Sequence, residues 1–348
     1  SCEQEIEKRN WAAAANERGS LGELPAAGVS TILAFRRLGP ATLRGSLQPG
    51  RGWAGRLLRV GVGALLATQG AAFAGAGLGL RAAAMGPYQE GSDFFVAARE
   101  PGSLSADLPI FGARKGVLRM EAPSPAPTSK KVPGAEETAF VLTNVLSKDE
   151  CEQVIALTES MGYQEDAPVS LARNIRRNEN CVWVTDDSIT DAIFSRCAHL
   201  LPQSISLQTT GGAGLQLGPV TGLNNRWRLY KYGPEDIFKQ HTDGAWPMSG
   251  IRDAKVVQDV HHGKQLSWLT FIMYLNDNFE GGATTLLLPS ADGSLDRVSV
   301  DPAVGSVLCF YHGHHPLSPL HEGSVVVRGV KYVARSDVMY QMPPGVVA

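Results

Sequence analysis

Two amphipathic helical patterns precede a long series of short apolar runs along the chain. Ser147 should start the first helix, because Glu150 three residues later completes a capping box, and Gly162 should end it. A second helix is expected from about Ser188 to Leu201. Seven apolar runs separated by turns follow: Trp227–Tyr232, Leu266–Leu275, Ala283–Leu288, Val298–Val300, Gly305–Tyr311, Ser324–Val327 and Lys331–Tyr340. Short strands with Gly and Pro between them predict a sandwich or barrel, so we expect an α+β fold with helices first and a double-sheet β-core after them.

The composition changes near residue 135 and divides the chain into three expected segments. Residues 135–348 have the globular pattern and are expected to form the main domain. Residues 86–134 are expected to be a mostly disordered linker, because the run 121–134 is rich in Pro and polar residues and cannot bury a core. Residues 1–85 are rich in Arg, Ala and Gly and are interpreted as a leader.

This leader admits three interpretations. Between Glu23 and Glu90 the chain has seven arginines and no acidic residue, which is typical of a transit peptide and favours a plastid or a mitochondrion. Residues 57–80 include an uncharged stretch just long enough to cross a bilayer, so a membrane anchor in the secretory pathway is the alternative. Disordered Ala/Gly-rich filler is the third interpretation.

Charge and cysteine content narrow the function classes. The formal net charge of −2 gives no basic field, so no nucleic-acid partner is indicated. The five cysteines are scattered and contain no CxxC pair, which favours reduced, mostly buried thiols over a disulfide framework or a zinc site.

A His-x-Asp motif carries the first candidate chemistry. In a strand, residues two apart project to the same side, so His241 and Asp243 can point at one ion. Ferrous oxygenases bind iron through two histidines and one carboxylate and keep coordination positions open. The motif is a weak signal by itself, and a third ligand is needed. The possible third ligands lie in the stretch 310–323 and are His312, His314, His315 and His321.

A second group of residues suits a dicarboxylate that chelates iron through its keto acid end. The distal carboxylate of 2-oxoglutarate needs a buried cation and one or two hydroxyls. Lys331 is the first candidate for the cation, and Arg335, four residues later on the same side of the expected strand, is the second. Tyr232 and Thr284 are candidates for the hydroxyls. Trp246 is a candidate for a pocket wall, whereas Trp268 stands in an apolar run and is expected in the core.

The chain resembles the catalytic domain of the prolyl 4-hydroxylase group of iron/2-oxoglutarate dioxygenases over about 200 residues, nearly everything after the expected linker. Each matching piece is weak alone, but the ordered set is specific. The pieces are VLTNVLSKDECEQVIALTESMGY (141–163), RNIRRNENCVWVTDD (173–187), RLYKYGPEDIFKQHTDG (228–244), LSWLTFIMYLNDNFEGGATT (266–285), DPAVGSVLCFYH (301–312) and PLHEGSVVVRGVKYVARSDVMY (319–340).

This resemblance implies a double-stranded β-helix (jelly-roll) core with N-terminal helices packed on it. It implies Fe(II), 2-oxoglutarate and O2 as reactants and L-ascorbate as the reductant. The family's third ligand precedes a glycine and valines and stands ten residues before the lysine, which selects His321. Tyr232 and Thr284 match positions where the family often contacts 2-oxoglutarate.

The substrate is less defined than the reaction. The long polar segment Gly244–Gln265 borders the substrate entrance in this family, so prolyl specificity does not carry over. The expected activity is therefore hydroxylation of a C–H bond in a peptide, with proline as one option, or in a small molecule. The alternative class is a cupin-like module that uses its metal structurally or serves in binding. The intact set of expected iron ligands and 2-oxoglutarate contacts favours the enzyme.

Overall fold

The structure is a computed structural model that describes residues 88–102, 104–167, 174–208 and 214–345. The leader expected at residues 1–85, with its transit-peptide and 57–80 anchor interpretations, lies outside these residues. Among the helices of the described part, none is long and apolar enough to span a bilayer.

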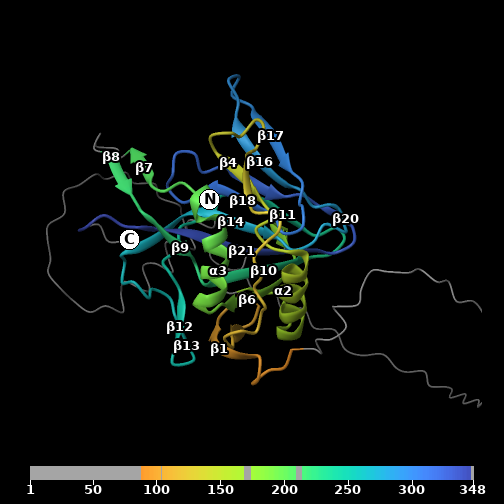
Figure 1. The fold of residues 1–348 in the computed structure, drawn as a ribbon. Coiled ribbons are helices and arrows are strands. Elements are labelled where there is room, and N and C mark those ends of the chain that lie inside the picture. The colour runs from red at the N-terminus through yellow and green to blue at the C-terminus, as the bar shows by residue number, and fades with distance from the viewer. Residues whose placement is uncertain (1–87, 103, 168–173, 209–213, 346–348) are drawn as a thin grey trace, which may run out of the picture. The chain divides into compact units, whose positions relative to one another are not determined.

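The largest element of the fold is a sheet to which the described residues contribute ten strands (Figure 1). Its strands are antiparallel, except that β2 and β6 run parallel. Nine strands follow one another in the order β1 (Phe94–Glu100), β2 (Leu108–Ala113), β6 (Glu179–Val184), β10 (Arg226–Tyr232), β21 (Lys331–Gln341), β14 (Gln265–Tyr274), β18 (Val307–Tyr311), β4 (Ala139–Thr143) and β3 (Thr128–Lys131), and β9 (Val220–Leu223) pairs with the C-terminal part of β21.

A smaller sheet supplies the second layer. Its order is β17 (Leu295–Val300), β16 (Thr284–Pro289), β19 (Leu320–Gly323), β11 (Ile237–His241) and β5 (Arg176–Arg177). Three further strand pairs form hairpins or short bridges: β7 (Ile205–Gln208) with β8 (Gly214–Leu217), β12 (Gly250–Arg252) with β13 (Lys255–Val257), and β15 (Glu280–Gly281) with β20 (Val326–Arg328).

Successive side chains along the strands of the large sheet point to opposite faces, and both faces are apolar. Neighbouring residues such as Val307 and Leu308 belong to different core clusters. One face of the sheet packs with the helices, and the other packs with Leu286 and Val300 of the small sheet. Strands buried on both faces explain why the apolar runs of the sequence are nearly continuous. Two packed, mainly antiparallel sheets are consistent with the expected jelly-roll core.

Two helices cover the face of the large sheet that is turned away from the small sheet (Figure 1). They are α2 (Lys148–Met161) and α3 (Asp187–Cys197), and a 3-10 turn, η2 (Ala198–Leu200), follows α3. Ser147 caps α2, its hydroxyl accepts from the Glu150 N–H, and Glu150 returns a bond to the Ser147 N–H, which confirms the expected capping box. The N-cap of α3 is Asp186, whose carboxylate accepts from the Ser188 N–H, so the helix begins at Asp187, one residue before the expected start at Ser188.

The prediction that residues 86–134 form a mostly disordered linker is wrong for the described part of that range, which contains β1, β2 and β3. Strand β1 pairs with β2, and Phe94 and Phe111 pack edge to face in the main core with ring centroids 5.8 Å apart. Strand β3 falls inside the Pro-rich run and pairs with β4, although all four of its residues are exposed. An edge strand of this kind needs only backbone hydrogen bonds to its neighbour, so a polar composition did not reveal it.

Candidate active site

Three side chains that suit a metal ion converge between the two sheets. His241 on β11 and His321 on β19 lie directly opposite each other in the antiparallel register. Asp243 follows the end of β11 by two residues. One ligand atom from each of the three lies within 4.8 Å of the others, and all three residues are buried. Strand pairing therefore joins two histidines that stand 80 residues apart in the sequence (321 − 241).

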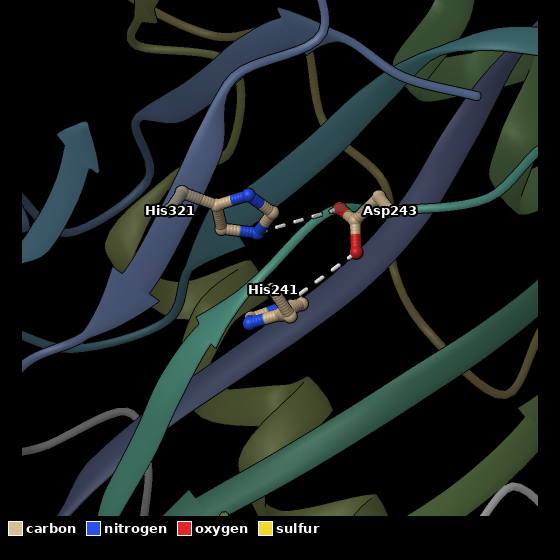
Figure 2. Close-up of side chains that lie close together, drawn as sticks. All are labelled: His241, Asp243 and His321. Atoms are coloured by element: carbon tan, nitrogen blue, oxygen red, sulfur yellow. Dashed lines mark ion pairs between the residues drawn. The ribbon is translucent and has the colours of Figure 1, made fainter. Parts of the chain in front are cut away.

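The distances suit a single ion. The Nε2 atom of His241 lies 3.7 Å from Oδ1 of Asp243, and Nε2 of His321 lies 3.7 Å from Oδ2 (Figure 2). Two ligand atoms bound to one ion at ~2.1 Å lie roughly 3–3.6 Å apart, so a small shift closes this set around a metal. These residues fit the two-histidine, one-carboxylate donor set that ferrous iron takes.

Backbone carbonyls orient both imidazoles. The Nδ1 atom of His241 lies 2.8 Å from the Lys239 carbonyl oxygen, and Nδ1 of His321 lies 3.3 Å from that of Pro319. A carbonyl can only accept, so each Nδ1 carries the proton and each Nε2 presents a lone pair to the site. Burial lowers the pKa of both rings below the usual range, and for His241 the neighbouring His321 lowers it further. Both rings are therefore neutral and ready to act as ligands.

Asp243 is held ionised by its neighbours. Burial alone would raise its pKa, but the charge of Arg335, the two imidazoles and a hydrogen bond hold the pKa well below its usual range. Nη1 of Arg335 lies 2.7 Å from Oδ1, and the Thr270 hydroxyl donates to Oδ2 over 2.7 Å. The ligand carboxylate is thus fixed by two groups that come from the large sheet.

These contacts belong to a closed polar ring beneath the candidate metal site. Arg335 also donates through Nη2 to Asp337 over 3.2 Å. Asp337 lies 3.7 Å from Nδ1 of His312, and that nitrogen lies 2.9 Å from the Thr270 hydroxyl. The ring passes through Asp243, Arg335, Asp337, His312 and Thr270 and returns to Asp243, which restricts the orientation of the carboxylate.

Lys331 supplies a buried cation beside the triad. Its Nζ donates to the Gly282 carbonyl over 2.6 Å and forms no ion pair with a carboxylate among the described residues. Burial lowers the pKa of its ammonium to about 7. Gly282 has a φ of +67°, and a Cβ there would lie 3.2 Å from Cδ of Lys331, so glycine allows this close backbone approach.

Two tyrosine rings lie near the same ammonium group, and one of the tyrosines binds Thr284. Tyr232 on β10 lies opposite Lys331 on β21, and the rings of Tyr232 and Tyr274 each have their centroid 5.6 Å from Nζ. The Tyr274 hydroxyl donates to the Thr284 hydroxyl over 2.8 Å. The Thr284 oxygen therefore accepts from Tyr274, and its own proton is available for an incoming acceptor.

The seven residues expected to hold the metal and 2-oxoglutarate all line one pocket. Its walls are Tyr230, Tyr232, Phe238, His241, Asp243, Ile272, Thr284, His321, Gly323, Lys331, Val333 and Arg335. The triad and Lys331 thus share one cavity, and its walls also carry apolar side chains. Arg335 shares the pocket with Lys331, but its guanidinium is bound to Asp243 and Asp337 rather than placed beside Lys331.

The other histidines of the stretch 310–323 are not part of the triad. His312 is buried in the polar ring, His314 is exposed, and the ring of His315 stacks on Tyr311 at 3.8 Å between centroids. Trp268 is buried in the main core, as expected. Trp246 does not line the pocket, and its ring lies under the guanidinium of Arg228, 4.4 Å from the ring centroid.

Tyr274, Thr270 and Asp337 also belong to this site and were not predicted from the sequence. Tyr274 stands near the end of the apolar run Leu266–Leu275. An aromatic residue in such a run is typical of a strand and does not indicate a ligand contact. The available signal for Thr270 and Asp337 was a polar residue inside a strand that is otherwise apolar, since a buried polar group needs a partner.

Comparison with known proteins gives no match of this sequence to a family model or to a curated protein. Solved structures do show similarity. One is the viral collagen prolyl hydroxylase of Paramecium bursaria Chlorella virus-1 in complex with 2-oxoglutarate, with 17% identity over 59% of this chain and 97% of that chain and a TM-score of 0.36.

Two further structures are similar at the same level. The prolyl-4-hydroxylase of Pseudomonas putida shares 14% identity over 59% of this chain and 93% of its own, with a TM-score of 0.36. The prolyl hydroxylase of Trichoplax adhaerens, solved with a hypoxia-inducible factor peptide, shares 18% identity over 58% of this chain and 83% of its own, with a TM-score of 0.36. At this identity and TM-score, function has to be argued from the geometry of the site itself.

Proposed function

We propose that this chain is an iron(II)- and 2-oxoglutarate-dependent dioxygenase built on a double-stranded β-helix. The observation that carries the proposal is one pocket that holds both a two-histidine, one-carboxylate set and a buried lysine without a carboxylate partner among the described residues. A structural metal site explains the first feature but not the second. A buried ammonium without a counter-ion is costly, so it indicates an anionic ligand.

His241, Asp243 and His321 are the proposed metal ligands. The two neutral imidazoles offer Nε2 and the aspartate offers one or both oxygens, which covers one face of an ion and leaves the opposite face open. The carbonyls of Lys239 and Pro319 keep the imidazoles in the ligating tautomer. Arg335 and Thr270 keep the aspartate ionised and fixed in orientation.

The proposed site for the distal carboxylate of 2-oxoglutarate is the ammonium of Lys331 with the hydroxyls of Tyr232 and Thr284. Along β21, Val333 stands between Lys331 and Arg335, and Arg335 contacts Asp243, so the Lys331 group and the triad are separate parts of the pocket. A charge-assisted hydrogen bond from the ammonium and a bond from the Thr284 hydroxyl would hold the carboxylate. The pocket walls also include the apolar side chains of Ile272 and Val333, which would help to exclude water from the chelate.

Iron and 2-oxoglutarate, when bound, would supply the oxidising chemistry: 2-oxoglutarate, O2 and a C–H bond are converted to succinate, CO2 and a C–OH group. The protein's part is to hold the two reactants in register, to exclude water and to present the substrate C–H bond at the open face. Ascorbate is the proposed reductant that keeps the metal ferrous. A peptide is the proposed substrate, with proline as the first residue to test.

Succinate formation from 2-oxoglutarate tests this proposal. The full chain is incubated with ferrous iron, ascorbate and 2-oxoglutarate in air, with and without a pool of proline-containing peptides, and succinate and peptide mass shifts are followed. We expect slow succinate formation without peptide and faster formation with a substrate. Binding of metal without any succinate formation, coupled or uncoupled, would instead support the cupin-like, non-catalytic alternative.

A further inference from the structure

The side chain of Arg228 lies on the same face of the sheet as the candidate active site. In the antiparallel register of β10 and β21, Tyr232 faces Lys331, Tyr230 faces Val333 and Arg228 faces Arg335. Residues two apart on a strand project to the same side. Since the first two pairs line the pocket, the Arg228 pair continues the row away from Lys331, and its member Arg335 contacts the proposed metal ligand Asp243.

Arg228 is a half-buried cation whose contacts are incomplete. Its guanidinium lies over the ring of Trp246 at 4.4 Å from the centroid, but it forms no hydrogen bond or ion pair with any residue that the structure describes. Burial lowers its pKa, and the nearby charge of Arg335 lowers it further. Asp337, whose charge also acts on Arg228, is already bound by Arg335.

Trp246 adds a second donor without an acceptor. Its Nε1 is buried and has no hydrogen-bond partner among the described residues. The backbone of Trp246 is held firmly, because its N–H donates to the Ser267 hydroxyl over 2.9 Å and its carbonyl accepts from the Ser267 N–H over 3.0 Å. The indole N–H and the guanidinium both lack an acceptor among the described residues, and the guanidinium lies over the indole ring, so the pair suits an acceptor that arrives with a ligand.

We propose that Arg228 and Trp246 form a subsite for a carboxylate of the substrate, so that the enzyme hydroxylates carboxylate-bearing molecules. This inference rests on the proposed function and names its substrate class. The planar guanidinium binds a carboxylate through two parallel hydrogen bonds, and the indole supports the guanidinium by stacking. The distal carboxylate of 2-oxoglutarate has its own cation in Lys331, which leaves Arg228 for the second reactant.

A carboxylate could come from a small acid or from an acidic residue of a peptide, and matched pairs distinguish these sources. In the first arm, N-acetyl-L-proline is compared with N-acetyl-L-prolinamide. In the second arm, Ac-Ala-Pro-Glu-NH2 and Ac-Glu-Pro-Ala-NH2 are compared with their glutamine counterparts. Each compound is added to the full chain with ferrous iron, ascorbate and 2-oxoglutarate, and succinate and product mass are measured.

Acid-selective stimulation in either arm supports the subsite and identifies the source. Equal stimulation by acid and amide overturns it. A protein that converts 2-oxoglutarate without substrate but responds to no acid in either arm also overturns it, while the proposed function survives. A protein that neither binds nor converts 2-oxoglutarate contradicts the proposed function, and the subsite as a substrate site is overturned with it.

Substitutions provide the second test. Arg228→Gln should raise the KM of the best acid by about 10- to 100-fold, with little change for its amide, and Arg228→Lys should recover part of the loss. Trp246→Phe keeps the stacking ring and removes the N–H, so a smaller rise of about 3- to 10-fold is expected. The control is Arg99→Gln, because Arg99 pairs with Asp107 on an exposed part of β1.

Binding without turnover gives an independent readout. With Mn(II) in place of iron, with 2-oxoglutarate and without oxygen, calorimetric titration should show that the acid binds more weakly to Arg228→Gln and to Trp246→Phe than to the wild type. If the acid binds with the same affinity to wild type, Arg228→Gln and Trp246→Phe, the subsite does not exist.

Discussion

Arg335 and Asp243 form a buried ion pair with Nη1 of the arginine 2.7 Å from Oδ1 of the aspartate. The aspartate is one of the three proposed metal ligands, so a fixed cation stands beside the place where a metal cation would bind. Arg335 therefore has two opposed effects. It holds the carboxylate ionised and oriented, and it repels the metal through its own charge.

Arg335→Met should destabilise the metal-free protein by about 3 kcal/mol, because it leaves the buried Asp243 carboxylate without its main counter-ion. A bound divalent ion can replace that counter-ion. Saturating Mn(II) should then raise the melting temperature of the variant more than that of the wild type. Differential scanning calorimetry with and without metal measures both changes.

The matched control for this prediction is Arg328→Met, since Arg328 pairs with Glu280 on the exposed surface. Its effect should stay within about 0.5 kcal/mol, as is usual for exposed pairs. If Arg335→Met is as harmless as this control, or if metal stabilises wild type and variant equally, Arg335 is not the counter-ion of the ligand carboxylate.

Local signals in the sequence were sufficient for the start of α2 and for the strands that the seven apolar runs mark, which are β10, β14, β16, β17, β18, β20 and β21. The capping box of Ser147 and Glu150 depends on residues three apart, and it stands in the structure as expected. The thiols of Cys151, Cys181, Cys197 and Cys309 are free and buried, again as expected. These features need no information about distant parts of the chain.

Features that depend on contacts between segments far apart in the sequence were harder to predict. Strand β19, which carries His321, was not expected, because PLHEG has no alternation and becomes a strand only by pairing with β11 and β16. The spacing of His241 and Asp243 assumed one continuous strand, whereas β11 ends at His241 and Asp243 follows it. The partner of Arg335 could not be read from spacing, since Asp243 approaches it from the other sheet.

His321→Ala should lower metal affinity by more than about 100-fold, since even the loss of a group that supports a ligand costs 10- to 100-fold. His314→Ala is the control in the same loop, because His314 is exposed and should leave the affinity unchanged. Titration with Mn(II), followed by electron paramagnetic resonance, gives both affinities. Equal losses in the two variants would mean that the third ligand is not His321.

Lys331→Met should stabilise the protein in the absence of 2-oxoglutarate. Burial lowers the pKa of Lys331 from 10.5 to about 7, so the charged form is disfavoured in the folded state. The unfolded chain binds more protons between these two values, and the free energy of unfolding of the wild type should rise with pH across that range. At pH 6 the variant should be more stable by about 2–4 kcal/mol, after the lost bond to Gly282 is allowed for.

Urea unfolding of both proteins at pH 6 and pH 9 measures this difference, which should shrink at the higher pH. Lys130→Met on the exposed strand β3 is the control and should change stability by less than about 0.5 kcal/mol. The same Lys331→Met variant should lose 2-oxoglutarate binding. A variant that is less stable than wild type at pH 6 would show that Lys331 has a structural role.

The affinity for 2-oxoglutarate should fall as pH rises above about 7, the pKa to which burial lowers Lys331 in the ligand-free protein. Below that pH the ammonium is charged and ready to bind a carboxylate. Above it, binding requires the uptake of one proton, so the dissociation constant should rise about tenfold per pH unit until the pKa of the complex is reached. Calorimetric titration of the Mn(II)-loaded protein without oxygen, from pH 6 to pH 9, measures both the affinity and the proton uptake.

Lys331→Arg is the control, because a guanidinium keeps its charge over this range. The affinity of this variant for 2-oxoglutarate should not change with pH. Parallel slopes in the wild type and Lys331→Arg would exclude Lys331 as the group that titrates.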